Sequence, residues 1–200
     1  MRYWETAGAT KTFTHPVDLS RLPGSGRIID YGCGYGRLTA RAGAEGYDPS
    51  AALIERARLA HPGVPFHVLT DPPRLPLADA TVDAVLLVAV LTCVPAEADQ
   101  RDLIAELARV LRPGVLYVSD LPLQTDGRNV ARYRRDAGVL GPYGTFRTSD
   151  GAVVRHHPSG YLEALVLSHF ATAESWAVEV ETMNAHPATA RQILARKEEQ

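Results

Sequence analysis

The stretch Arg27–Asp48 constrains the fold of this chain more than any other. It opens with a short apolar segment, continues as Asp30-Tyr31-Gly32-Cys33-Gly34-Tyr35-Gly36 and ends at Asp48. Glycine permits positive φ and a close approach of the backbone to a ligand. The residues after Gly36 favour a helix whose free N–H groups face the same point. This pattern is typical of a nucleotide-type cofactor site at the carboxyl end of the first strand of a parallel sheet.

The connection after the glycine loop is short. Only twelve positions separate Gly36 from Asp48, and a strand–helix–strand crossover needs about a dozen residues at minimum. We therefore expect a shortened first helix of about two turns and a shortened second strand near Glu45–Tyr47.

Beyond Asp48, strand-like and helix-like segments alternate, which predicts an α/β three-layer sandwich with a mostly parallel sheet. The predicted strands after Asp48 are a third strand at Pro65–Leu69, a fourth at Val82–Leu91 and a fifth at Val115–Ser119. A helix capped by Ser50 precedes the third strand. A second helix precedes the fifth strand, with Glu97 in its first turn, Arg109 and Arg112 near its end and Pro113-Gly114 as its stop.

The alternation stops at residues 121–158, a polar insertion expected to contain a hairpin around Ser149-Asp150-Gly151. After it, Ser159 is expected to cap a further helix. Two terminal strands follow, at Ala177–Met183 and Gln192–Ala195, and the last of them is expected to be antiparallel to the rest.

Length and composition fit one domain over residues 1–200, with residues 1–22 as a lid or a tail. The net charge of -2 gives no general attraction to nucleic acid or to an anionic membrane. Cys33 and Cys93, the only cysteines, fit reduced thiols in a cytoplasmic protein. The longest apolar run, Ala84–Leu91, is eight residues, too short for a membrane span.

A glycine loop alone leaves two cofactor classes open. A dinucleotide dehydrogenase shows G-x-G-x-x-G with an acid about 20 residues further on. Here Arg37 stands where that fingerprint has its third glycine, and Asp30 precedes the first glycine by two residues.

The loop Asp30–Gly36 resembles the glycine motif of class I S-adenosylmethionine-dependent methyltransferases. Similar segments continue through residues 25–120: Gly46-Tyr47-Asp48-Pro49-Ser50, Leu75–Asp79 with Val82–Val85, and Leu111–Leu116. The resemblance implies S-adenosyl-L-methionine as cofactor and a seven-stranded sheet in the order 3-2-1-4-5-7-6. The chain departs from the family in its short first crossover and in the single Gly114 before the fifth strand.

The resemblance also implies positions for the cofactor. Asp30 and the loop would hold its methionine end, Asp48 its ribose hydroxyls and Asp71 its adenine amine. The predicted cofactor-binding residues are Asp30, Gly32, Cys33, Gly34, Gly36, Asp48, Pro49, Asp71, Pro72, Val88, Ala89 and Leu91. No metal ligands are predicted.

The predicted substrate is a small molecule, methylated on oxygen or nitrogen. Enzymes of this fold that methylate bases or glutamine often carry Asn/Asp-Pro-Pro-aromatic after the fourth strand, where this chain has Val90-Leu91-Thr92-Cys93. No basic tract is interleaved with aromatic residues. We expect no nucleic-acid partner, no membrane and a monomer or homodimer. Two alternatives stay open: a same-fold cyclase or decarboxylase that uses the cofactor without transferring methyl, and a non-catalytic cofactor-binding module.

Candidate substrate residues lie in the insertion and the terminal loop, because such segments cover the ligand-binding edge of the sheet. Only one of the adjacent His156 and His157 can face the site from an extended segment, and we favour His157 as the base. Arg128 and Arg132 either grip an acidic substrate group together or form a solvated face. The predicted catalytic residues are His157, His156 and Tyr143, and the predicted substrate-binding residues are Trp4, Gln124, Arg128, Arg132, Tyr133, Arg155, Asn184 and His186.

Overall fold

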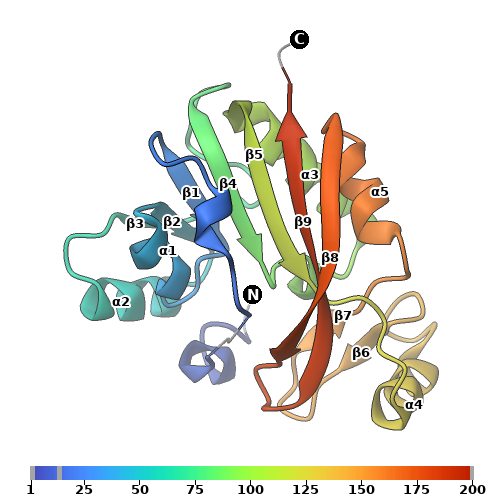
Figure 1. Cartoon of the computed structure of the whole chain (residues 1–200). Coiled ribbons are helices and arrows are strands. Elements are labelled where there is room, and N and C mark those ends of the chain that lie inside the picture. The colour runs from blue at the N-terminus through green and yellow to red at the C-terminus, as the bar shows by residue number, and fades with distance from the viewer. Residues whose placement is uncertain (1–2, 13–14, 199–200) are drawn as a thin grey trace.

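The computed structural model describes residues 3–12 and 15–198 (Figure 1). Its strands are β1 (Ile28–Tyr31), β2 (Glu45–Asp48), β3 (Phe66–Val68), β4 (Val82–Val88), β5 (Leu111–Asp120), β6 (Thr145–Arg147), β7 (Val153–Arg155), β8 (Thr172–Glu181) and β9 (Pro187–Lys197). Its α-helices are α1 (Arg37–Ala42), α2 (Ala51–Ala60), α3 (Glu97–Val110), α4 (Gly127–Asp136) and α5 (Tyr161–Leu167), and its 3-10 helices are η1 (Ala7–Thr10), η2 (Leu19–Arg21) and η3 (Leu91–Cys93).

One seven-stranded sheet forms the centre of the molecule, in the order β3-β2-β1-β4-β5-β9-β8. The strands β1 to β5 pair in parallel, and β9 runs antiparallel to both β5 and β8. With β8 and β9 counted as the sixth and seventh strands, this is the predicted order. The parallel register aligns the carboxyl ends of β1, β2 and β4 at one edge, where ligands bind in such sheets.

Helices and the N-terminal region cover the two faces of the sheet. On β4, Val85 and Leu87 point to the face covered by α3 and α5, whereas Ala84 and Leu86 point to the face covered by α1 and by residues 17–22. Successive strand residues face opposite sides, so an apolar run such as β4 is buried on both. The result is the predicted three-layer arrangement (Figure 1).

The first crossover contains two short elements, because only twelve positions separate Gly36 from Asp48. The helix α1 has six residues and β2 has four. Gly43 ends α1 in the left-handed conformation with φ 62°, and the chain enters β2 two residues later. Both shortened elements agree with the prediction.

Several predicted boundaries were wrong, including the start of β5, which begins at Leu111 and not at Val115. Helix α3 ends at Val110, so Arg112 lies in β5, where it pairs with Asp83. Gly160, with φ 74°, precedes α5 without a side-chain cap, so Ser159 is not its cap. The strand β4 ends at Val88 because Ala89 takes a φ of 57°. The terminal strands β8 and β9 are longer than predicted because they pair with each other over ten registered positions.

The insertion, residues 121–158, lies beyond the carboxyl end of β5, next to the turn between β8 and β9 (Figure 1). Asp126 accepts a hydrogen bond from the Asn129 backbone N–H and so caps α4. The strands β6 and β7 pair antiparallel around the turn at Ser149-Asp150-Gly151, as predicted. No helix among the described residues is long and apolar enough to span a membrane.

Candidate active site

The glycine loop passes close under the residues that follow β4. Gly32 has a φ of 70°, and a Cβ added to it would lie 2.4 Å from Cγ2 of Val90. Its N–H and that of Cys33 both donate to the carbonyl of Tyr47 at the end of β2. Conformation and contact together require glycine at position 32.

Asp30 is a buried carboxyl at the base of this loop. Its Oδ2 accepts a hydrogen bond of 2.7 Å from Oγ1 of Thr39. Burial, together with a smaller effect of the nearby Asp48, raises the pKa of Asp30 to about 7. A cation placed beside Asp30 would favour its ionised form.

Asp48 joins the end of β2 to the loop. Its Oδ2 accepts from the Gly34 backbone N–H at 2.9 Å, and its Oδ1 accepts from the Ser50 N–H at 2.8 Å. Burial raises the pKa of this carboxyl as well. The contact with Gly34 explains how a short crossover still holds the acid beside the loop.

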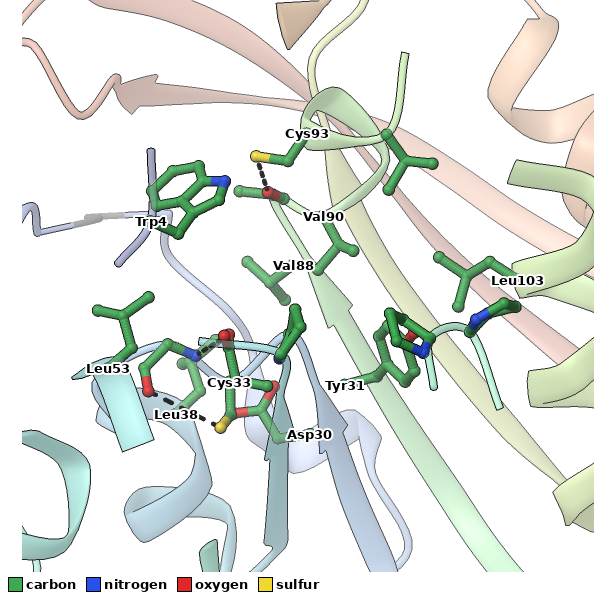
Figure 2. Close-up of a pocket in the computed structure, with 18 of the residues that line it drawn as sticks. Trp4, Asp30, Tyr31, Cys33, Leu38, Leu53, Val88, Val90, Cys93 and Leu103 are labelled. Atoms are coloured by element: carbon green, nitrogen blue, oxygen red, sulfur yellow. Dashed lines mark hydrogen bonds between the residues drawn. The ribbon is translucent and has the colours of Figure 1, made fainter. Parts of the chain in front are cut away.

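A cavity of about 480 Å³ opens above these residues (Figure 2). This first cavity has the size of a pocket for a small molecule. Four carboxyls border it, together with one guanidinium: Asp30, Asp48, Asp99, Asp102 and Arg37. Such a cavity suits a ligand that carries positive charge.

Residues 3–12, which we call the N-terminal strap, extend beside this cavity. Trp4 lines it, opposite Val88 and the loop in Figure 2. The carbonyl of Trp4 accepts from Oγ of Ser50, and the Glu5 carboxylate accepts from the N–H of Ala51. Arg56 on α2 donates to two further strap carbonyls. The strap is thus fastened to the start of α2.

A second, smaller cavity of about 50 Å³ adjoins the first. Ala89 and Cys93 line both cavities and mark their junction. The second cavity is closed by the insertion and by the turn between β8 and β9. Its remaining lining residues are His15, Thr92, Leu121, Arg128, Arg132, Phe146, Thr148, Val154, His156, Thr182, Met183, Asn184 and His186.

The adjacent histidines point to different surroundings, as an extended segment requires. His156 lines the second cavity, and its Nδ1 lies 2.5 Å from the hydroxyl oxygen of Tyr133. Burial lowers the pKa of His156 well below its usual range. His157 is instead buried against Tyr161, with the two rings stacked at 5.3 Å, and it borders neither cavity.

Most of the predicted cofactor residues meet at the first cavity. The structure places there Asp30, Gly32, Cys33, Gly34, Asp48, Pro49, Pro72, Val88 and Ala89. Three others lie elsewhere. Gly36 caps α1 and faces Phe66, Asp71 is exposed, and Leu91 is fully buried in the core because the chain turns at Ala89.

The predicted substrate residues separate into two groups. Arg128, Arg132, Asn184 and His186 line the second cavity with His156, and Trp4 lines the first. The rest border neither cavity. Arg155 is buried in an ion pair with Glu97, and the Gln124 amide bonds the backbone of Thr189. Tyr133 contacts two lining residues of the second cavity, His156 and Phe146, and Tyr143, predicted as catalytic, is 45% exposed.

Several lining residues escaped the sequence analysis. His15, Arg37 and Asp99 come from three different parts of the chain, and no local pattern marks them. Arg37 follows the glycine loop directly and donates to the carbonyl of His15 at 2.9 Å. Its place at the first turn of α1 was the one available signal. Among the described residues, no three His, Cys, Asp or Glu side chains gather as a metal site.

Residues 29–119 match the family model of a methyltransferase domain. A crystal structure of a SAM-dependent methyltransferase from Methanosarcina mazei has a TM-score of 0.84 to this chain at 24% identity, over 94% of this chain and all of that one. A possible histamine N-methyltransferase from Thermotoga maritima has a TM-score of 0.65 at 19% identity, over 90% of this chain and 86% of its own.

A curated relative, an L-glutamine:2-deoxy-scyllo-inosose aminotransferase of Streptomyces lividus, is 37% identical over 122 residues. The match covers 55% of this chain but only 28% of the relative, so it does not describe that protein as a whole. Three observations indicate the same cofactor, S-adenosylmethionine: the matched domain, the strand order and the carboxyl-lined cavity at the glycine loop. These findings support a class I S-adenosylmethionine-dependent methyltransferase fold, with residues 29–119 as its methyltransferase domain.

Proposed function

We propose that this enzyme methylates an oxygen or nitrogen of a small molecule that lies across the junction of the two cavities. The observation that carries the proposal is the junction itself: Ala89 and Cys93 line both cavities, so the second lies directly beside the first. A small space next to a cofactor cavity suits part of a small molecule better than a macromolecule.

The residues of the first cavity fit S-adenosylmethionine. The cofactor supplies a methyl group already activated on a sulfonium. Asp30 would bind a cationic part of the cofactor, since its buried carboxyl lacks a cationic partner within hydrogen-bond reach in the described structure. Asp48 would accept from the ribose hydroxyls, and it is already fixed by Gly34 and Ser50. Pro72 and Pro49 would border the adenine.

The insertion would act as a substrate cap, and the strap as a lid that keeps water from the first cavity. Both functions need a segment that is fixed to the rest of the protein. The strap is held to α2 through Ser50 and Arg56. The insertion is held to β9 by the Gln124 amide, which donates to the carbonyl of Thr189, and to α3 by the ion pair between Arg155 and Glu97.

Of the groups at the second cavity, His156 is the best placed to remove a proton from the methyl acceptor. Burial keeps its ring neutral at pH 7, and a neutral imidazole can accept a proton. The Tyr133 hydroxyl fixes the ring at Nδ1. His15 is a second neutral ring at this cavity, with its Nδ1 3.2 Å from Oγ of Ser119. We propose His156 in place of His157, which lies away from both cavities.

The proposal is tested with S-adenosylmethionine labelled in the methyl group and a panel of small hydroxy and amino compounds. We expect label in a small-molecule product, and we expect Asp48→Ala to abolish both cofactor binding in calorimetry and turnover. Product formation without label would identify the cyclase or decarboxylase alternative. Binding without any product would identify the non-catalytic module.

The role of His156 needs a variant that keeps its structural contact. His156→Asn retains a polar atom near Nδ1 for the Tyr133 hydroxyl but removes Nε2. We expect it to slow methylation of a hydroxyl by about 100-fold or more while cofactor affinity stays constant. The control is His169→Asn, an exposed histidine outside both cavities. Equal rates in the His156 variant and the control would rule out His156 as the base.

A further inference from the structure

The two joined cavities differ sharply in charge. The first is bordered by four carboxyls and one guanidinium, whereas the described lining of the second has two arginines, three histidines and no acid. A methyl acceptor that extends from the first cavity into the second therefore passes from acidic to basic surroundings. We take the molecule that occupies the second cavity to be the methyl acceptor, and this assignment rests on the proposed function.

Arg128 and Arg132 give the second cavity its positive charge. They stand four residues apart on α4, so they share one face of the helix. Asp126, the nearest acid along the chain, caps this helix through Asn129 and forms no ion pair with either arginine. Among the described residues, neither arginine has an acidic partner within salt-bridge distance.

Arg132 has one buried N–H group that lacks a hydrogen-bond partner. Its guanidinium lies 3.6 Å above the ring centroid of Phe146, and its Nε is buried with no hydrogen-bond partner. Burial and the neighbouring Arg128 lower the pKa of Arg132 to about 10. The Arg132 side chain is partly exposed, so an anion can reach its guanidinium, and a planar oxyanion is the group that its N–H donors match best.

The other polar groups at this cavity favour an anion as well. Oδ1 of Asn184 already accepts from Nζ of Lys11 at 2.7 Å, so its amide N–H groups are the ones left to donate. The volume of about 50 Å³ admits one small group rather than a whole molecule.

We propose that the second cavity binds a carboxylate of the methyl acceptor, with Arg128 and Arg132 as its cationic partners. The rest of the acceptor then extends through the junction at Ala89 and Cys93 into the first cavity. The enzyme would select acids over their neutral amides or esters, because only the anion pairs with the two guanidinium groups.

The binding test uses the protein saturated with S-adenosylhomocysteine and two probes, acetate and its neutral counterpart acetamide. The readout is the Nε–Hε NMR signal of Arg132, with chloride at equal ionic strength as reference. We expect a saturable shift with acetate and none with acetamide. Arg128→Gln should weaken acetate binding by about tenfold, and Arg134→Gln, on the exposed side of the same helix, should leave it unchanged. Unaltered cofactor binding shows that each variant is folded.

Three results would overturn the proposal: acetate acting no differently from chloride, acetate binding that Arg128→Gln leaves unchanged, or saturation by inorganic phosphate but not by acetate. A turnover test pairs hydroxy or amino acids with their carboxamides. Equal methylation of both members would overturn the carboxylate assignment while the methyltransferase proposal stands. Acetate binding without methylation of any compound would instead support the anion site and reject the proposed reaction.

Discussion

The two cavities of this protein are built in different ways. The first forms where β1, β2 and β4 end, and backbone groups of the glycine loop contact its main acid, Asp48. The second is formed by side chains of α4, the insertion hairpin and the turn between β8 and β9. One depends on backbone conformation and the other on which side chains pack together. They should therefore respond differently to substitution.

The largest effect is expected for Gly32→Ala in the first cavity. The new Cβ would lie 2.4 Å from Val90 at a φ of 70°, so the loop must move away from β4. We expect loss of detectable cofactor binding in calorimetry and a fall of about 3 kcal/mol or more in the free energy of unfolding.

Gly34→Ala is the matched control for that substitution. Gly34 also has a positive φ, of 55°, but a Cβ there meets nothing within 4 Å. We expect a loss of about 1 kcal/mol from the backbone conformation alone. If both variants lost the same stability, the contact between Gly32 and Val90 would not be what requires glycine.

This contrast also shows what the sequence could predict. Residues at strand ends and in the glycine loop were placed well because the parallel sheet brings those ends to one edge. Leu91 was predicted to lie at the cofactor. The backbone instead turns at Ala89, with a φ of 57°, and Leu91 lies in the core. Arg155 was predicted to bind substrate. It instead pairs with Glu97, which is 58 positions away in the chain. Such long-range pairings leave no local pattern.

The second prediction concerns the insertion and should leave the first cavity intact. The Tyr133 hydroxyl lies between the Gln124 backbone N–H and Nδ1 of His156. Tyr133→Phe leaves both groups buried without this partner, at a cost of about 1–3 kcal/mol in unfolding free energy. We expect slower methyl transfer with unchanged affinity for S-adenosylhomocysteine. Weakened cofactor binding would show that the two regions are energetically coupled.

The third prediction concerns pH and the first cavity. Below pH 7 the Asp30 carboxyl holds a proton, since its pKa is about 7. A cationic cofactor must displace that proton, so affinity should rise with pH between 5.5 and 7, by up to about tenfold per unit. Calorimetry across this range measures the slope, and Asp30→Asn should flatten it. A wild-type affinity that is constant with pH would contradict a cation beside Asp30.

The same carboxyl predicts the pH dependence of stability without cofactor. Its pKa is raised in the folded state, so the folded protein binds more protons than the unfolded chain between pH 4 and 7. Stability from this group is therefore present at low pH and lost as pH rises through about 7. Bound cofactor should reduce that loss, because its positive charge favours the ionised carboxyl.

The smallest effect is expected at the strap, which touches both regions. Nζ of Lys11 lies 2.7 Å from Oδ2 of Asp150 in the insertion hairpin and donates to Asn184 at the second cavity. Lys11→Met should cost about 0.5–1 kcal/mol, because both ends of the ion pair are partly exposed. We expect release of S-adenosylhomocysteine to become roughly two- to fivefold faster in stopped-flow measurements, since the strap then loses its ion pair to the insertion and keeps the hydrogen bond from the Tyr3 hydroxyl to Asp150.

High salt should reproduce part of this effect in the wild-type protein and none of it in the Lys11 variant. The control is Arg21→Met, which breaks an exposed ion pair with Glu174 on the far strand β8 and borders neither cavity. Unchanged release in the Lys11 variant would mean that the ion pair between Lys11 and Asp150 does not limit cofactor release, and that the contacts with α2 and the hydrogen bond from Tyr3 to Asp150 hold the strap. Faster release would mean that the strap, which contacts both α2 and the insertion, couples cofactor release to the second cavity.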